Sequence, residues 1–199
     1  TARRSMNLLT IEWANRGINM WTIDEGFINL VQGTSTYDLP AATIDLIEQV
    51  IRTGAGSTTL QSDLNLSRIS VSTYSSVPNK LTQGRPIQVW VDRLRDNPTV
   101  TVWPVPDRGT AIAPYYILRY WRLRRIENAG AGIETPDMNF RFFPALVSGL
   151  AYYIATKIPE LMPRIEMLKL QYEEQYALAA GEDREKASIS LVPRIYGVS

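Results

Sequence analysis

The clearest hydrophobic pattern lies in the C-terminal part of the chain, from about Asn139 to Lys186. Apolar residues recur there at steps of three and four, which place them on one stripe of a helix. The first half of the pattern consists of Phe140, Phe143, Val147, Leu150 and Ile154, and the second half of Leu161, Ile165, Leu168, Tyr172 and Tyr176. Small residues interleaved with the first half would let a neighbouring helix approach closely.

Ile158-Pro159 separates the two halves, because a residue before proline avoids the helical region and proline suits a first helical turn. Two amphipathic helices joined by so short a link predict an antiparallel hairpin, whose second helix would be about 40 Å long. Such a hairpin cannot bury its apolar stripe alone. Residues 1–16, with Leu9 and Trp13 on one side, predict a third helix that brings the two ends of the chain together.

The middle of the chain, from residue 21 to residue 132, has a different pattern. Short runs rich in valine, isoleucine, threonine and tyrosine alternate with turn-forming residues, as is typical of strands. The predicted strands are Phe27–Gln32, Leu46–Arg52, Ile87–Val91, Thr99–Trp103 and Tyr115–Arg122, with a weaker sixth at Leu66–Ser72. The turn-forming Asp96-Asn97-Pro98 makes the third and fourth of these a candidate hairpin. No helix of about 10 to 15 residues separates successive strands, so we expect an antiparallel sheet rather than a doubly wound parallel one.

These patterns predict an α+β fold: a helical bundle, formed by the N-terminal helix and the long C-terminal helical hairpin, with an inserted antiparallel β domain. Residues 1–20 and 133–187 would form the bundle and residues 21–132 the β domain. Residues 188–199 have no helical period and predict an extended C-terminal tail.

Composition excludes several classes of enzyme. The chain contains no cysteine and no histidine, which removes disulfides, thiolate chemistry and the commonest general base and transition-metal ligand. Its two short glycine pairs lack the context of a nucleotide-binding motif, and no calcium-loop spacing is present. We therefore expect no cofactor and no bound metal.

The overall composition indicates neither a membrane-spanning protein nor a protein that binds nucleic acid through its net charge. The longest charge-free apolar run, Phe142–Thr156, is shorter than the roughly 20 residues that span a bilayer, and the N-terminus shows no secretory pattern. The net charge is only +1, but it is unevenly distributed. Arg85–Arg125 holds eight basic and three acidic residues, whereas Glu160–Lys186 holds four basic and seven acidic residues, a polarity that suits head-to-tail assembly.

Paired carboxylates offer one enzymatic alternative, because glycoside hydrolysis requires only two of them. The candidates are Asp24 with Glu25, Glu134 with Asp137, and Glu173 with Glu174. They support the hypothesis of a peptidoglycan-degrading glycosidase. Neighbouring carboxylates seldom face each other across a substrate, so a solvated surface role is the favoured interpretation.

Four arginines, Arg119, Arg122, Arg124 and Arg125, form a basic aromatic segment with Tyr120 and Trp121. Two interpretations stay open for them. The arginines either cover a sheet and pair with acidic residues, or form a positive surface for phosphate backbones, as in a non-specific DNA-binding module. Tyrosines and tryptophans are abundant, and we expect Tyr115, Tyr120, Tyr152 and Tyr196 to lie at protein interfaces.

Several phrases occur together in an order and spacing that resemble a known family. They are Trp13–Thr22, Gly33–Pro40, Gly84–Pro86, Trp103–Asp107 and the helical segment Leu146–Ala155. Over about 150 residues the chain resembles the head-to-tail adaptor (connector) proteins of short-tailed bacteriophages, the family of tail tubular protein A and the tail accessory factors.

The resemblance implies a structural virion protein and not an enzyme. Family members are expected to form a homo-oligomeric ring of about twelve copies beneath the portal protein, at the head–tail junction of the virion, after synthesis in the host cytoplasm. The ring would extend the channel for double-stranded DNA during ejection and dock the tail tube or nozzle protein. By position, the portal-binding residues would be Ile189, Leu191, Pro193, Ile195 and Tyr196. The DNA-channel-facing residues would be Arg119, Arg122, Arg124 and Arg125.

Overall fold

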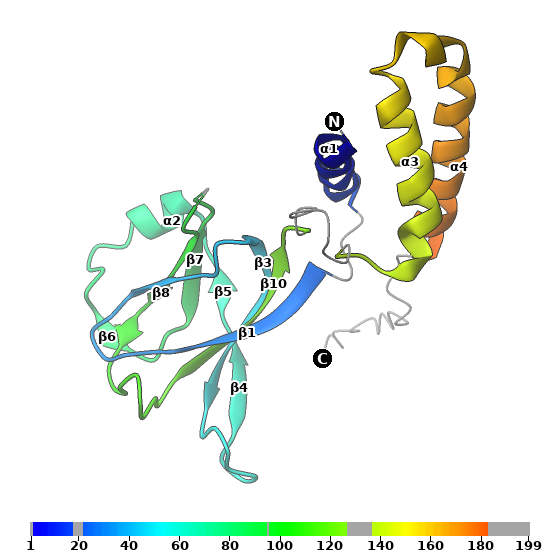
Figure 1. Ribbon diagram of the computed structural model, residues 1–199. Helices are drawn as coiled ribbons and strands as arrows, with labels where there is room; N and C mark the ends of the chain where they lie inside the picture. The colour runs from blue at the N-terminus through cyan, green and yellow to red at the C-terminus, as the bar shows by residue number, and fades with distance from the viewer. Residues whose placement is uncertain (1, 18–21, 95, 127–136, 183–199) are drawn as a thin grey trace, which may run out of the picture. The chain divides into compact units, whose positions relative to one another are not determined.

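A computed structural model describes residues 2–17, 22–94, 96–126 and 137–182 (Figure 1). Contacts divide these residues into two compact units. The helical unit is formed by segments 2–17 and 137–182, and the β unit by residues 22–126 apart from residue 95. The chain is therefore an α+β protein, as the sequence predicts.

The helical unit contains three long helices. Their bounds are Ala2–Asn15 for α1, Phe143–Ala155 for α3 and Ile165–Glu182 for α4, with 3₁₀ helices at Phe140–Phe142 and Pro159–Arg164. The break between α3 and α4 falls at Ile158, as predicted. The α-helix that follows begins later than expected, because Pro163 lies inside the 3₁₀ turn and cannot donate a backbone hydrogen bond. The described part of α4 has 18 residues and is about 27 Å long, and the last predicted residues, 183–186, lie outside the described part of the chain.

Helix α3 turns a different face inward from the one predicted. Phe140, just before α3, is 71% exposed and Val147 is 67% exposed, although both belong to the predicted apolar stripe. The buried residues of α3 are Ala145, Leu146, Ser148, Gly149 and Ala155, and all of them except Leu146 are small. Small side chains let the helices approach closely, and this close packing outweighs the burial of the larger residues. On α4 the predicted stripe does face inward, and Tyr172 is fully buried at its centre.

Helix α1 packs against both other helices. Its Leu9 and Trp13 are completely buried, and the Trp13 ring lies 5.7 Å from Phe142 and 6.4 Å from Tyr176. At Gly149, a Cβ atom would lie 2.8 Å from the Tyr172 ring and 2.9 Å from Leu9. Glycine at this position therefore allows the three helices to meet.

The β unit contains ten strands and one short helix in the part of the chain described (Figure 1). The longer strands are β1 Ile23–Asn29, β3 Thr43–Thr53, β4 Ser62–Asn65, β7 Gln88–Asp92, β8 Thr99–Trp103 and β10 Ile117–Arg124. The short elements are β2 Thr36–Asp38, β5 Ser67–Arg68, β6 Gln83–Gly84, β9 Val105–Pro106 and helix α2 Val71–Ser75. Two four-stranded sheets have the orders β1-β10-β3-β4 and β2-β8-β7-β5, and β6 pairs with β9.

Side chains from both four-stranded sheets meet in one hydrophobic core. It includes Leu30, Leu39, Leu46, Ile51, Leu66, Val89, Val91, Val100, Val102, Tyr116, Leu118 and Tyr120. The predicted hairpin between β7 and β8 is confirmed, with Val89 opposite Val102 in an antiparallel register. The two sheets thus share one apolar interior, and β7 shows the alternation most clearly, with Val89 and Val91 turned toward the core.

Three details of the β prediction are wrong. The β5–β7 and β6–β9 pairs are parallel, although each is only two residues long. The predicted strand Leu66–Ser72 is extended only at Ser67–Arg68, because the Ser70 side chain accepts a hydrogen bond from the Thr73 N–H and starts α2. Tyr120 is a core residue rather than an interface residue, since its ring fills the space where Gly26 has no side chain.

Substitution of Gly149 by alanine is expected to lower the free energy of unfolding. The new methyl group would overpack against Tyr172 and Leu9, at a cost of about 1–3 kcal/mol, and this outweighs the gain in helix propensity of about 1 kcal/mol. Gly181→Ala in α4 is the matched control, because no atom lies within 4 Å of its added Cβ. Urea unfolding followed by circular dichroism should give opposite signs for the two variants; stabilisation by both would contradict the close packing.

Candidate functional site

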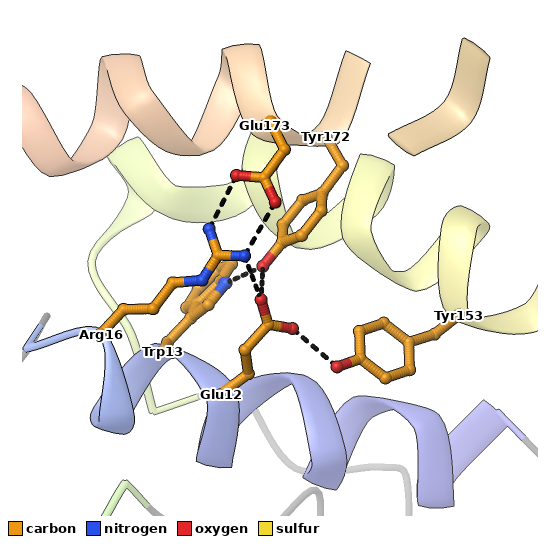
Figure 2. A network of polar contacts seen from close by, with 6 residues as sticks. All are labelled: Glu12, Trp13, Arg16, Tyr153, Tyr172 and Glu173. Carbon is orange, nitrogen blue, oxygen red and sulfur yellow. Dashed lines mark hydrogen bonds and ion pairs between the residues drawn. The ribbon is translucent and has the colours of Figure 1, made fainter. Parts of the chain in front are cut away.

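A network of polar side chains joins the three helices of the helical unit (Figure 2). The Glu12 carboxylate of α1 accepts hydrogen bonds from the hydroxyl of Tyr153 on α3, at 2.6 Å, and from the hydroxyl of Tyr172 on α4, at 3.1 Å. The indole N–H of Trp13 donates to the Tyr172 hydroxyl at 3.0 Å. One carboxylate therefore binds all three helices together.

Arg16 completes the network at its exposed edge. Its guanidinium donates two hydrogen bonds to the Glu173 carboxylate on α4, at 2.7 and 2.8 Å, and forms an ion pair with Glu12 at 2.6 Å. The guanidinium also lies 4.5 Å from the centre of the Tyr176 ring. This paired geometry fixes the last turn of α1 against α4.

The pKa shifts in the network favour one fixed set of protonation states. Burial raises the pKa of Tyr172 well above its usual value of 10.0, and burial together with the hydrogen bond to Glu12 raises that of Tyr153 to about 12. The hydrogen bonds from Arg16 lower the pKa of Glu173. Both tyrosines therefore remain donors and Glu173 remains charged at neutral pH, so these groups do not exchange protons there.

The predicted arginine segment lies on β10 and pairs with acidic residues of β1. Arg119 forms an ion pair with Glu25, and Arg122 and Arg124 pair with Asp24 at 3.3 and 3.1 Å. Arg122 also donates to the Thr43 hydroxyl. The three arginines of β10 thus have acidic partners, as the first of the two interpretations expects, and their contact with DNA stays a prediction. Arg125, at the end of β10, is exposed.

The carboxylate pairs do not form an open catalytic site in the described residues. Asp24 and Glu25 bind the arginines of β10, and Glu173 binds Arg16. Each of these carboxylates is held by an arginine, so none of them is free to face a substrate as catalysis by a carboxylate pair requires. Glu174 lies on the exposed surface of α4, and Glu134 lies outside the described residues. Within those residues, no group of three or more acidic side chains is arranged to hold a metal ion.

The five predicted portal-binding residues also lie outside the described part of the chain. They are Ile189, Leu191, Pro193, Ile195 and Tyr196. Their role stays a prediction.

A groove of about 450 Å³ lies on the outer side of α3 and α4. Its lining residues are Phe143, Pro144, Val147, Ser148, Ala151, Gln171 and Gln175, and we call this surface the groove face. Val147 is two residues from Gly149, which contacts Leu9 of α1, and Gln171 and Gln175 are each two residues from Glu173, which binds Arg16. Two residues correspond to about 200° around a helix. The groove face is therefore opposite the side that α1 covers.

The sequence predicts an apolar stripe that the hairpin cannot bury alone, and two of its residues, Phe143 and Val147, are exposed on the groove face. The signal that identifies the inner face is the run of small residues, since only these permit the contact with Leu9 and Tyr172. The polar network was not predicted, because its members are far apart in the sequence.

A comparison with known families gives one match. The family described as SU10 adaptor protein matches residues 2–194. The chain belongs to the SU10 adaptor protein family. The resemblance to phage head-to-tail adaptors is thereby confirmed over nearly the whole chain, and this adaptor is a structural component of the virion. No curated protein matches the chain.

Membership of this family agrees with the geometry of the described residues. An adaptor works through surfaces, and the charged groups described above, on β1, β10 and the three helices, take part in ion pairs or in the network between helices. No described helix of the adaptor is both long and apolar enough to cross a bilayer.

Replacement of Tyr172 by phenylalanine is expected to lower the free energy of unfolding by about 1–3 kcal/mol, because the buried indole N–H of Trp13 loses its acceptor. Tyr152→Phe is the matched control: its ring stacks on Tyr172 at 6.2 Å, and phenylalanine keeps that stack. Denaturant unfolding should show a change within about 0.5 kcal/mol for the control. Equal losses in both variants would mean that the Trp13 hydrogen bond carries no stability.

Removal of the Glu173 charge is expected to give a stability difference that depends on pH. Arg16 lowers the pKa of Glu173 in the folded state below the ordinary 4.5, so its contribution is complete above about pH 5 and is lost as the pH falls below 4.5. By urea unfolding, wild type should be more stable than Glu173→Gln at pH 7, and this difference should shrink as the pH falls below 4.5. The neighbouring Glu174→Gln should differ little from wild type at any pH, and a constant gap for Glu173→Gln would exclude this linkage.

Proposed function

We propose that the chain is a head-to-tail adaptor that assembles as a ring of about twelve copies beneath the portal protein. The ring extends the DNA channel, binds the portal and docks the tail tube or nozzle protein. The family match over residues 2–194 supports the adaptor role.

The observation that carries the proposal is the one-sided packing of α3 and α4. Helix α1 covers one side of this pair, while the groove face leaves Phe143 and Val147 accessible to solvent. Helix α3 contains no charged residue, so its outer surface gains little from water. Apolar surface of this kind marks an interaction site, and in a ring such contacts are heterologous and close on themselves.

The proposal gives each part of the chain a task. The helical bundle of residues 1–20 and 133–187 forms the ring, the β domain of residues 21–132 meets the tail, and the segment 188–199 reaches the portal. Contact between the arginines of β10 and channel DNA would have to compete with their ion pairs to Asp24 and Glu25. Such contact therefore needs one of these pairs to open, or depends on Arg125.

Native mass spectrometry of the full chain with the portal protein of the same phage tests the proposal. We expect a complex that contains about twelve adaptor copies on one portal ring. Deletion of residues 188–199 should weaken binding to the portal by at least about tenfold, or about 1.4 kcal/mol. Leu60→Ser, at an exposed position of the β unit, is the control and should bind as wild type does. A chain that stays monomeric and never binds the portal would exclude the proposal.

A further inference from the structure

Helix α1 has a second apolar stripe, on the side turned away from α3 and α4. Leu8 is 43% exposed and Ile11 is 53% exposed, whereas Leu9 and Trp13 of the same helix are completely buried. Arg4, Leu8, Ile11 and Asn15 follow one another at steps of three and four and are all exposed, and we call them the α1 outer stripe. They lie on one face of the helix. The helical unit therefore carries two uncovered apolar surfaces, on different helices.

We propose that the groove face of one adaptor copy is covered by the α1 outer stripe of the next copy in the ring. This inference rests on the proposed ring and names the surfaces that form it. The inner side of α1 already covers one side of the α3–α4 pair. A neighbour's α1 would cover the other side, so that the pair lies between two α1 helices.

The charges of α1 and of α4, the helix that borders the groove, are complementary. Apart from the residues of the polar network, α1 carries two arginines, Arg3 and Arg4, and no acidic residue. Apart from Glu173, α4 carries the exposed residues Glu166 and Glu174 against the single cation of Lys169. A basic helix with an apolar stripe thus meets an apolar groove bordered by an acidic helix. Opposite charges at the rim favour this pairing over α1 with α1 or α4 with α4, both of which bring like charges together.

The two surfaces also differ in shape, as a head-to-tail contact requires. The groove face is concave and lined by side chains from two helices, and the α1 outer stripe is the convex surface of one helix. A helix in a groove is a common mode of recognition, with anchors at spacings of three and four residues. A contact between two different surfaces leaves one of each free at the ends of every open assembly, and only ring closure covers them all.

Cysteine cross-linking tests the contact directly, because the chain has no cysteine of its own. The single variants Leu8→Cys, Ile11→Cys and Val147→Cys would be assembled with portal protein and oxidised. Mixtures of Val147→Cys with Leu8→Cys or Ile11→Cys should give covalent dimers, and double variants such as Leu8→Cys with Val147→Cys should give a ladder of higher oligomers. Ile112→Cys, at an exposed position of the β unit, is the control and should not cross-link with Val147→Cys.

Val147→Asp gives an independent measure of the same contact. The aspartate should weaken adaptor assembly by roughly thirtyfold, because a charged carboxylate replaces a central apolar contact and would have to lose its water. Its melting temperature as a monomer should stay close to that of wild type, because Val147 is exposed in the single chain. The control Ile112→Asp should assemble as wild type does.

The outcomes separate this inference from the proposed function. Assembly of wild type on the portal without any cross-link from Val147 to Leu8 or Ile11 would overturn the contact and leave the ring intact. Strong cross-linking of Val147→Cys with itself would show that the groove face pairs with its own copy, which also overturns the inference. Failure of wild type to assemble at all would remove the proposed function and this contact together.

Discussion

The helical unit depends on the close approach of three helices at Gly149. A single methyl group there would lie within 3 Å of both Leu9 and Tyr172, so α1, α3 and α4 meet with no spare volume. The same Tyr172 extends its hydroxyl to Trp13 and Glu12 and joins the apolar contact to the polar network. Packing sets how near the helices come, and the hydrogen bonds set which residues face each other. Because α1 occupies this side of the α3–α4 pair, the opposite side stays uncovered.

The sequence predicted those parts of the fold that depend on local pattern. The alternation in Ile87–Val91 and Thr99–Trp103 identified the β7–β8 hairpin, because one face of each strand is buried over its whole length. The start of α4 was less accurate, since Pro163 affects the geometry of a turn rather than the hydrophobic period. The short parallel pairs β5–β7 and β6–β9 could not be predicted, because each depends on loops that bring distant segments together.

The inward face of α3 shows where reasoning from hydrophobicity alone fails. The large residues Phe140 and Val147 carry the strongest periodic signal, but a face that contains Gly149 and Ala145 allows α1 and α4 to approach. In an isolated globular protein the large residues would be buried first. In the proposed ring, neighbouring copies would cover these side chains, which explains their exposure in the single chain. The sequence also could not identify the partners of the β10 arginines, because the acidic residues on β1 are almost a hundred residues away in sequence.

The first and last long strands of the β unit, β1 and β10, are paired, with Ile23 opposite Leu123. Directly opposed residues in antiparallel strands lie only about 5 Å apart, so the chain enters and leaves this unit at almost the same point. The helical unit is therefore interrupted at a single place, whatever the size of the insertion. A β unit of another shape can be grafted there during evolution without rearranging α1, α3 or α4. If the β unit meets the tail as proposed, recombination between phages would change tail specificity on an unchanged helical scaffold.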